Sequence, residues 1–240
     1  MEKAIDFLAT QLNVVSIDFL PHVQQLIPLT FFFSKAHTPS ADQTKWLKQW
    51  FWKTAFSRRY SSQTDEKMDS DITCFEGFVA GNTGTLEKYS YSVSAEQLVK
   101  QKFTRNSPLV RAFLLLLAQK NPLNLVNGNK VDLGKALSKY NSKEYHHVFP
   151  RAYLKKREFP VEKINSVANF CFLPADSNKK ISSKAPSDYF VTVVPQAAFA
   201  EILESNLLPL NKEVYEKNDF EKFLTLRSQR LIEFLDKQLV

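Results

Sequence analysis

The segment from Glu144 to Pro186 limits the fold more than any other part of the chain, because short apolar runs alternate with polar stretches in a clear order. It begins with YHHVF, a β-like run that ends at Pro150. The basic stretch RAYLKKREFPVEK follows and is expected to be a loop. Asn169 then opens a second apolar run, NFCFL, and PADSNKKISSK has the character of a helix that presents Asn178. The segment therefore predicts a strand, a loop, a second strand and a helix.

Helices are expected through most of the remaining chain. Residues 1–34 read as two helices, and Ser40 begins another with a capping-box pattern. An apolar helix is predicted over 108–120, and Asn218 opens a long C-terminal helix with an apolar stripe. The polar residues 61–71 are expected to be a loop or a helix entry, and the short run that follows them is ambiguous.

Two aromatic and basic features of the first half have more than one interpretation. Trp50 and Phe51 recur with apolar neighbours at helical spacing, which favours a buried stripe over a base-stacking platform. Arg58, Arg59 and Tyr60 either contact DNA or brace the helical region, and the sequence leaves both readings open.

The composition narrows the classes of protein. The net charge is +7, and residues 141–190 contain nine Lys or Arg and five Asp or Glu, which suits a phosphate-rich partner. Only two cysteines occur, so a disulfide framework or zinc knuckle is not expected. The longest apolar run, 112–118, is too short to cross a membrane, and the N-terminus lacks a signal-peptide pattern, so a cytoplasmic protein is expected. Gly134-Lys135 does not complete a Walker A motif, because Asn129 and Ala136 occupy two required positions.

The residue types in the segment from Glu144 suit phosphodiester hydrolysis. An imidazole that titrates near neutral pH is a good general base for an attacking water, and His146 and His147 are adjacent. The carboxamide of Asn178 is a neutral oxygen ligand for a hard divalent ion. Because neighbouring side chains on a strand point to opposite faces, one histidine is expected to reach the metal from the strand end or through local twist.

These motifs resemble those of HNH nucleases. HHVFP is similar to their first strand, in which Asp or His is followed by His, a hydrophobic residue, any residue and Pro. NFCFLPADSNKK is similar to their second half, in which an Asn opens the second strand and an Asn or His follows roughly nine residues later. The C-terminal nuclease half of GmrSD-type modification-dependent restriction endonucleases resembles the chain most closely, and its upstream helical region resembles WLKQWFWKTAFSRRYSS.

The resemblance implies a role for each matching residue. His146 and Asn178 would be metal ligands for Mg²⁺ or Mn²⁺, and His147 would be the general base. Asn169 would be the central asparagine that ties down the loop between the strands, with Asn165 as a rival for that position, because the interval from His147 is longer than in compact members. Four basic residues would lie near the phosphate path: Arg151, Lys179, Lys180 and Lys184.

The resemblance also implies an architecture and partners. The expected fold is mainly α with an embedded ββα-metal finger: a helical lobe over 1–120, an HNH-like nuclease lobe over 121–190, and C-terminal helices over 191–240 that pack on the helical lobe. The expected function is a DNA endonuclease in restriction of foreign or phage DNA. An NTP-binding domain would be a separate N-terminal domain or partner chain. The alternatives are a non-catalytic nucleic-acid-binding or regulatory module with a degenerate site, or a nuclease acting on RNA.

Overall fold

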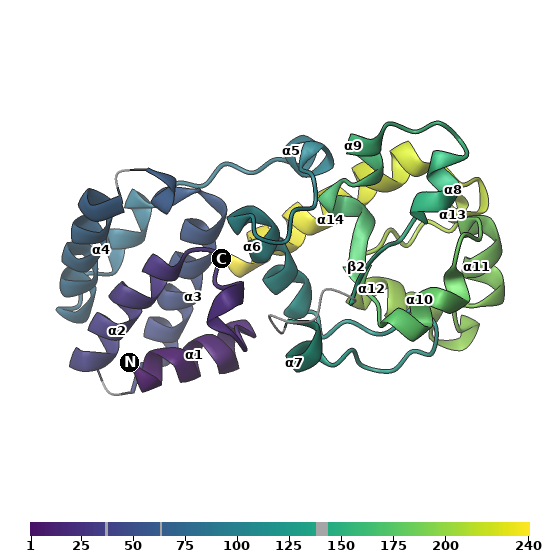
Figure 1. Ribbon diagram of the computed structural model, residues 1–240. Coiled ribbons are helices and arrows are strands. Elements are labelled where there is room, and N and C mark those ends of the chain that lie inside the picture. Colours follow the sequence, from purple (N-terminus) through teal and green to yellow (C-terminus); the bar gives the residue numbers. More distant parts are fainter. Residues whose placement is uncertain (37, 63, 138–143) are drawn as a thin grey trace. The chain divides into compact units, whose positions relative to one another are not determined.

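The computed structural model of the chain describes residues 1–36, 38–62, 64–137 and 144–240 (Figure 1). The described chain is mainly helical, with a small two-stranded antiparallel sheet. It divides into two compact units. Unit 1 comprises residues 1–93, 106–115 and 235–240, and unit 2 comprises residues 94–105 and 116–234.

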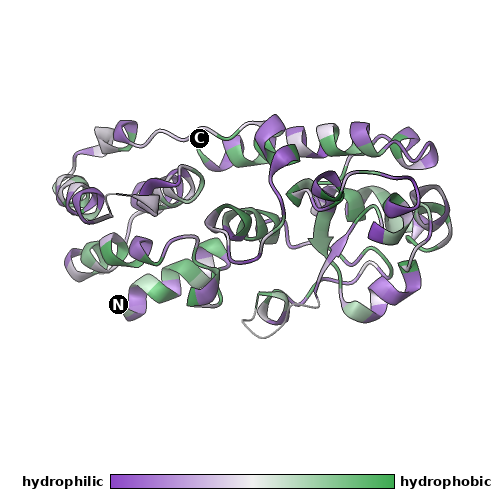
Figure 2. Cartoon of the chain, turned by 45° about the horizontal axis from the view of Figure 1, so that its top comes forward, coloured by the Kyte–Doolittle hydropathy of each residue, from purple (hydrophilic) through white to green (hydrophobic). Residues whose placement is uncertain are grey.

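Unit 1 is helical throughout its described elements. Its elements are α1 (Glu2–Leu12), η1 (Ile17–Phe19), η2 (Val23–Gln25), α2 (Leu26–Lys35), α3 (Ala41–Phe56), η3 (Arg59–Ser61), α4 (Thr64–Val79) and η4 (Thr83–Lys88). The first part of α6 (Pro108–Ala118) and the end of α14 (Phe220–Gln238) also belong to it. Figure 2 shows hydrophobic and hydrophilic residues on opposite sides of several helices, as expected where one side is buried.

The aromatic residues of α3 form the core of unit 1. Ser40 caps the helix by accepting from Gln43 N, as the capping-box pattern predicts. Trp46 stacks on Phe78 at 4.0 Å between ring centroids, and Trp50 meets Phe75 edge-on at 4.8 Å. All four rings are buried, so the prediction of a buried stripe is confirmed and these rings are not a base-stacking platform.

A buried carboxylate organises the segment that the sequence left ambiguous. Residues 64–79 form one helix, α4, which agrees with the helix-entry alternative for 61–71 and settles the ambiguous run that follows. Asp71 is fully buried in it and accepts hydrogen bonds from Arg59 Nε at 3.0 Å, from Tyr89 OH at 2.7 Å and from Tyr60 OH. Arg59 and Tyr60 therefore brace unit 1, whereas the neighbouring Arg58 is exposed.

Unit 2 surrounds the sheet with short helices. Its elements are α5 (Ala95–Lys100), the end of α6, α7 (Leu133–Ala136), β1 (Tyr145–His147), α8 (Arg151–Lys155), α9 (Val161–Ile164), η5 (Val167–Asn169), β2 (Phe170–Phe172), α10 (Ala175–Ile181), α11 (Pro186–Thr192), η6 (Gln196–Ala198), α12 (Phe199–Ser205), α13 (Glu213–Glu216) and most of α14.

The order of elements from β1 to α10 agrees with the predicted strand, loop, strand and helix, with one correction. The basic stretch 151–163 is not a plain loop, because it contains α8 and α9, which begin directly after Pro150 and Pro160. Proline fixes φ at a value suited to a helix start, so each proline sets where its helix begins.

The boundaries of the units differ from the expected lobes. The core of unit 2 joins residues from the hairpin region, such as Val148 and Cys171, to C-terminal residues such as Phe199, Leu208 and Phe223. Residues 191–234 thus share one core with the hairpin and belong to the same unit as residues 94–105 and 116–120. Every described helix is too short or too polar to cross a membrane.

Candidate functional site

The hairpin formed by β1 and β2 has two chemically different faces. Its register pairs Tyr145 with Phe172, His146 with Cys171 and His147 with Phe170. Directly opposed residues of an antiparallel pair share a face, so His146 lies on the face of Cys171 and His147 on the face of Phe170. The Cys171 face belongs to the core of unit 2, whereas the other face is covered by Phe103, which stacks on Phe170 at 4.0 Å. The pleat therefore separates the two histidines, as the sequence leads one to expect.

His147 is held by an aromatic ring and a carboxamide. Its imidazole packs on the Phe170 ring with 4.2 Å between centroids, and its Nε2 lies 3.1 Å from Asn165 Oδ1. A carbonyl oxygen only accepts, so in the neutral ring Nε2 carries the hydrogen and Nδ1 the lone pair. Asn165 thus fixes the tautomer that leaves Nδ1 able to accept a proton.

The surroundings of His147 favour its neutral form. Burial lowers the pKa of His147 to about 4, and the positive charge of Arg151 and the neighbouring His146 act in the same direction, against the hydrogen bond to Asn165. The imidazole is consequently uncharged at neutral pH, which is the state that a general base requires.

Asn169 ties the end of β1 to the residues before β2. The residue is fully buried, and its Oδ1 accepts from Phe149 N at 2.8 Å. Its Nδ2 donates to Phe149 O at 3.1 Å and to Ile164 O at 3.0 Å, and its backbone oxygen accepts from Val148 N at 2.7 Å. The Asn169 side chain thus joins Phe149 to Ile164 between the strands, while the Asn165 side chain contacts the imidazole of His147.

Asn178 lies on α10, the helix that follows β2 after two residues. The buried face of α10 contributes Ile181 to the same core as Cys171. His146 and α10 are therefore on the same side of the hairpin. Both His146 and Asn178 are half-buried, so each combines a fixed backbone with some access to solvent.

The predicted basic residues divide into three kinds. Arg151 is the first residue of α8 and is exposed, and its charge is felt at His147. Lys179 forms an exposed ion pair with Asp176 at 3.1 Å. Lys180 and Lys184 are exposed in and just after α10, with no ion pair to another described residue. Arg151 is therefore the one whose positive charge acts on a candidate catalytic group.

The donor set limits how a divalent ion is held. No group of three or more His, Cys, Asp or Glu side chains within the described ranges is arranged to hold a metal ion. His146 and Asn178 would supply one nitrogen and one oxygen from the same side of the hairpin. Mg²⁺ usually keeps several waters and takes phosphate oxygens as further ligands, so two protein donors fit a metal that binds together with a nucleic-acid phosphate.

One buried residue behind the hairpin was missed in the sequence. Arg227 on α14 is fully buried and donates to Ala168 O at 2.8 Å and to Asn206 O at 3.3 Å. Burial lowers its pKa to about 10. It occupies the apolar stripe of the C-terminal helix between Leu224 and Leu231, and that placement is the signal that identifies it.

Comparison with known proteins yields one distant relative. The chain is 26% identical over 243 residues to a protein of Methanocaldococcus jannaschii described as uncharacterized protein MJ0686. The match covers 89% of this chain and 40% of that protein, so the chain spans about two fifths of the relative's length. No family model and no solved structure matches the chain.

Proposed function

We propose that this chain is a metal-dependent endonuclease of the HNH (ββα-metal) kind that hydrolyses phosphodiester bonds in DNA. The observation that carries the proposal is the environment of His147: a neutral imidazole, fixed by Asn165 at the end of a short hairpin, with Arg151 beside it. The hairpin and α10 supply a second half-buried donor pair, His146 and Asn178, on one side of the sheet. A restriction role against foreign DNA rests on the sequence resemblance.

Each of the chain's residues has a chemical task in this proposal. His147 accepts a proton at Nδ1 from the attacking water, and Asn165 keeps the ring in the required tautomer. Arg151 offers a positive charge to the phosphate that undergoes attack. Asn169 holds Val148 and Phe149 in place, which fixes the end of β1 where His147 is presented.

The divalent ion, Mg²⁺ or Mn²⁺, is part of the proposal. When bound, such an ion withdraws negative charge from the phosphate and the leaving oxygen. His146 and Asn178 are the residues that would hold it.

Divalent-dependent nicking of supercoiled plasmid tests the proposal. Purified protein with Mg²⁺ or Mn²⁺ is expected to convert supercoiled plasmid to the open-circular form, and EDTA is expected to abolish the conversion. His147→Ala is expected to lower the rate at least about a hundredfold, within the usual range for a general base. His147 is half-buried and is not part of the core of unit 2, so the variant is expected to stay folded, with thermal unfolding close to that of the wild type.

A matched control distinguishes the loss of the general base from the loss of positive surface charge. Lys156→Ala changes an exposed residue just after α8 and is expected to nick at close to the wild-type rate. Wild-type nicking by His147→Ala would refute the assignment of the base. Metal-independent DNA binding without any cleavage by the wild type would instead favour a binding or regulatory module with a degenerate site.

A further inference from the structure

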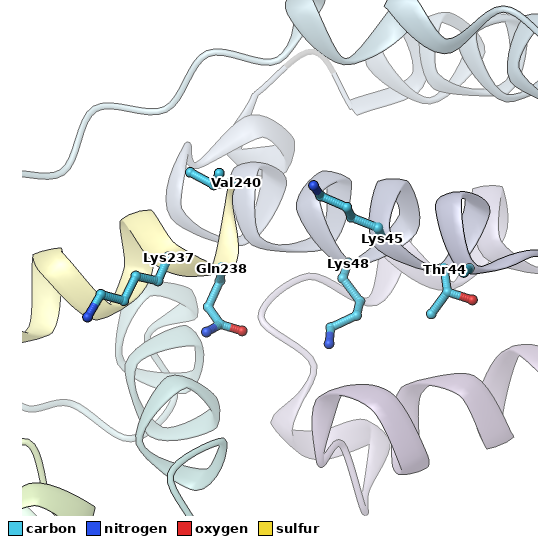
Figure 3. Close-up of a pocket in the computed structure, with 7 residues that line it drawn as sticks. Thr44, Lys45, Lys48, Lys237, Gln238 and Val240 are labelled. Carbon is cyan, nitrogen blue, oxygen red and sulfur yellow. The ribbon is translucent and has the colours of Figure 1, made fainter.

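Unit 1 contains an open pocket whose side chains are rich in positive charge and hydrogen-bond donors. The pocket has a volume of about 410 Å³, far more than the roughly 30 Å³ that a water occupies in the liquid. Figure 3 shows its lining residues on two elements, with Thr44, Lys45 and Lys48 along α3 and Lys237, Gln238 and Val240 at the end of the chain. Ala41 completes the lining.

The three lysines lack acidic side-chain partners among the described residues. None of the lining residues has an acidic side chain, and none of the three lysines forms an ion pair with another described residue. Asp42 and Asp236 are next to the lining residues in sequence but do not line the pocket, and Asp236 accepts from Tyr91 OH at 2.5 Å. The pocket thus gathers three lysine ammonium groups, with no acidic side chain among its lining residues.

The three lysines lie on two different helices. Lys237 lies in the last turn of α14, where a positive charge stabilises the helix end. Lys45 and Lys48 lie in the N-terminal half of α3, three residues apart and therefore on one side of the helix, where like charges repel. Figure 3 shows the amino groups of Lys45 and Lys48 pointing away from each other, which suits two separate phosphates rather than one anion between them.

The donor chemistry selects the class of ligand. Ammonium groups, the Thr44 hydroxyl and the Gln238 amide can all donate to phosphate oxygens, and lysine is a common phosphate-binding residue. The pocket is open to solvent and has no aromatic wall on which a free base could stack. These features suit a backbone phosphate rather than a nucleotide held by its base.

We propose that Lys45, Lys48 and Lys237 in this pocket bind phosphates of a nucleic-acid backbone, which gives unit 1 a DNA contact of its own. This inference rests on the proposed function, because it takes DNA as the substrate. Such contacts carry no sequence information and position the duplex. They also depend on salt, because each neutralised phosphate releases counterions.

The test measures binding of a labelled duplex by fluorescence anisotropy over a range of salt concentrations in EDTA. The pocket variant is Lys45→Glu with Lys48→Glu, and the control is Lys35→Glu with Lys88→Glu, which makes the same charge change at exposed residues of unit 1. The pocket variant is expected to bind at least about tenfold more weakly than the control. Its plot of log affinity against log salt is expected to be less steep by about two, near 0.9 for each lost phosphate contact.

Several outcomes would overturn the inference. Equal losses in both variants would mean that only net charge matters. Displacement of DNA from the wild type by ATP or inorganic phosphate, together with loss of that small ligand's binding in the pocket variant, would assign the pocket to free phosphates. The double variant Lys45→Gln with Lys48→Gln removes both charges without reversing them. It is expected to bind the duplex more weakly than the wild type but less weakly than the glutamate variant. Tryptophan fluorescence checks that it is folded.

The test is separable from that of the proposed function. If the wild type never nicks DNA, and Lys45→Glu with Lys48→Glu abolishes duplex binding, the proposed nuclease activity is refuted and the pocket assignment is supported. If the pocket variant binds the duplex normally, and cleavage depends on His147, the pocket assignment is refuted and the proposed nuclease activity is supported.

Discussion

At the scale of single residues, two asparagines near the hairpin have different tasks. The Asn169 side chain satisfies buried backbone groups of Phe149 and Ile164, whereas the Asn165 side chain contacts the imidazole of His147. An unpaired buried polar group is costly, while loss of a single contact at a half-buried residue is not. Replacement of Asn169 should therefore mainly lower stability, whereas replacement of Asn165 should mainly lower activity.

The first prediction compares Asn169→Ala with Asn165→Ala. Asn169→Ala should lower the free energy of unfolding of unit 2 by about 3 kcal/mol, because three buried backbone groups lose their partner. Asn165→Ala should lower the free energy of unfolding by less than about 1 kcal/mol. It should nevertheless slow nicking on the order of tenfold, because His147 would no longer be held in the tautomer that leaves Nδ1 able to accept a proton. Urea unfolding followed by circular dichroism and a plasmid assay measure both. The reverse pattern would make Asn165 the structural residue.

Another residue, His22, couples the stability of unit 1 to pH. It is buried against Tyr60, with 5.5 Å between ring centroids, and its Nε2 has no hydrogen-bond partner among the described residues. Burial, and to a lesser extent the charge of Arg111, lowers the pKa of His22 to about 4 from 6.5. Between pH 4 and pH 6.5, His22 is therefore protonated in the unfolded chain and neutral in the folded chain.

The second prediction follows from that difference. Unit 1 should lose stability as the pH falls from 6.5 towards 4, by up to about 3 kcal/mol from His22. His22→Gln cannot take up the proton, so its stability should fall less over the same range. All three tryptophans lie in α3, so urea unfolding followed by tryptophan fluorescence reports on unit 1 and not on His147. Parallel losses in the two proteins would exclude His22 as the cause.

At the scale of elements, β1 and β2 have three residues each, and a two-stranded hairpin of that size is marginal by itself. Its position depends on the helices around it: Tyr189 of α11 donates to Val148 O at 2.7 Å, and Arg227 of α14 donates to Ala168 O. The hairpin presents His146 and His147 because the surrounding helices hold it.

The third prediction concerns the pair of elements that would hold the metal. His146→Ala on β1 and Asn178→Ala on α10 should each weaken Mn²⁺ affinity at least about tenfold in the presence of duplex DNA. Lys180→Ala, two residues further along α10, should leave the metal affinity unchanged and weaken only DNA binding. Calorimetric titration of Mn²⁺ into the four proteins compares them. Unchanged affinity in both ligand variants would remove the assignment of the site.

The elements also show how far a sequence can be interpreted without a structure. The capped helix at Ser40, the long C-terminal helix and the order of elements around the hairpin follow from periodicity and capping, and the structure agrees. Helix α4 was left undecided by the sequence because its buried positions are Asp71, Cys74, Phe75 and Phe78. Their spacing is helical, but a buried charge occupies the first position and hides the apolar period.

The other structural features that the sequence did not predict have similar physical reasons. Helices α8 and α9 have five and four residues, too few to display a period. The tautomer-fixing contact of Asn165 joins residues 18 apart in sequence, so only the folded chain reveals it. The grouping of residues 191–234 with the hairpin depends on long-range packing that local patterns do not contain.

At the scale of the whole molecule, positive charge occurs in both units. The net charge is +7, and unit 1 has its own lysine-lined pocket, separate from the basic residues of α8 and α10 in unit 2. Neither the sequence nor the described part of the structure contains a phosphate loop of the Walker type. Charge of this kind attracts DNA with little preference among sequences.

The fourth prediction is that the chain acts without nucleotides. Plasmid nicking should be unchanged by added ATP or GTP, and unmodified and glucosyl-hydroxymethylcytosine DNA should be cut at similar rates. Cleavage by this chain at two salt concentrations, with and without nucleotide, tests both statements, and higher salt should slow it. Strong discrimination between the two DNAs would place recognition of the modification in this chain.

The two cysteines give each unit a chemical reporter. Cys74 is buried in α4 of unit 1 and Cys171 in β2 of unit 2, and burial raises the pKa of Cys171 to about 11. A thiol reagent attacks the thiolate, so each cysteine reacts only when its own unit opens. Mass spectrometry after brief alkylation therefore distinguishes opening of the aromatic core around α3 from opening of the hairpin, in a single unlabelled sample.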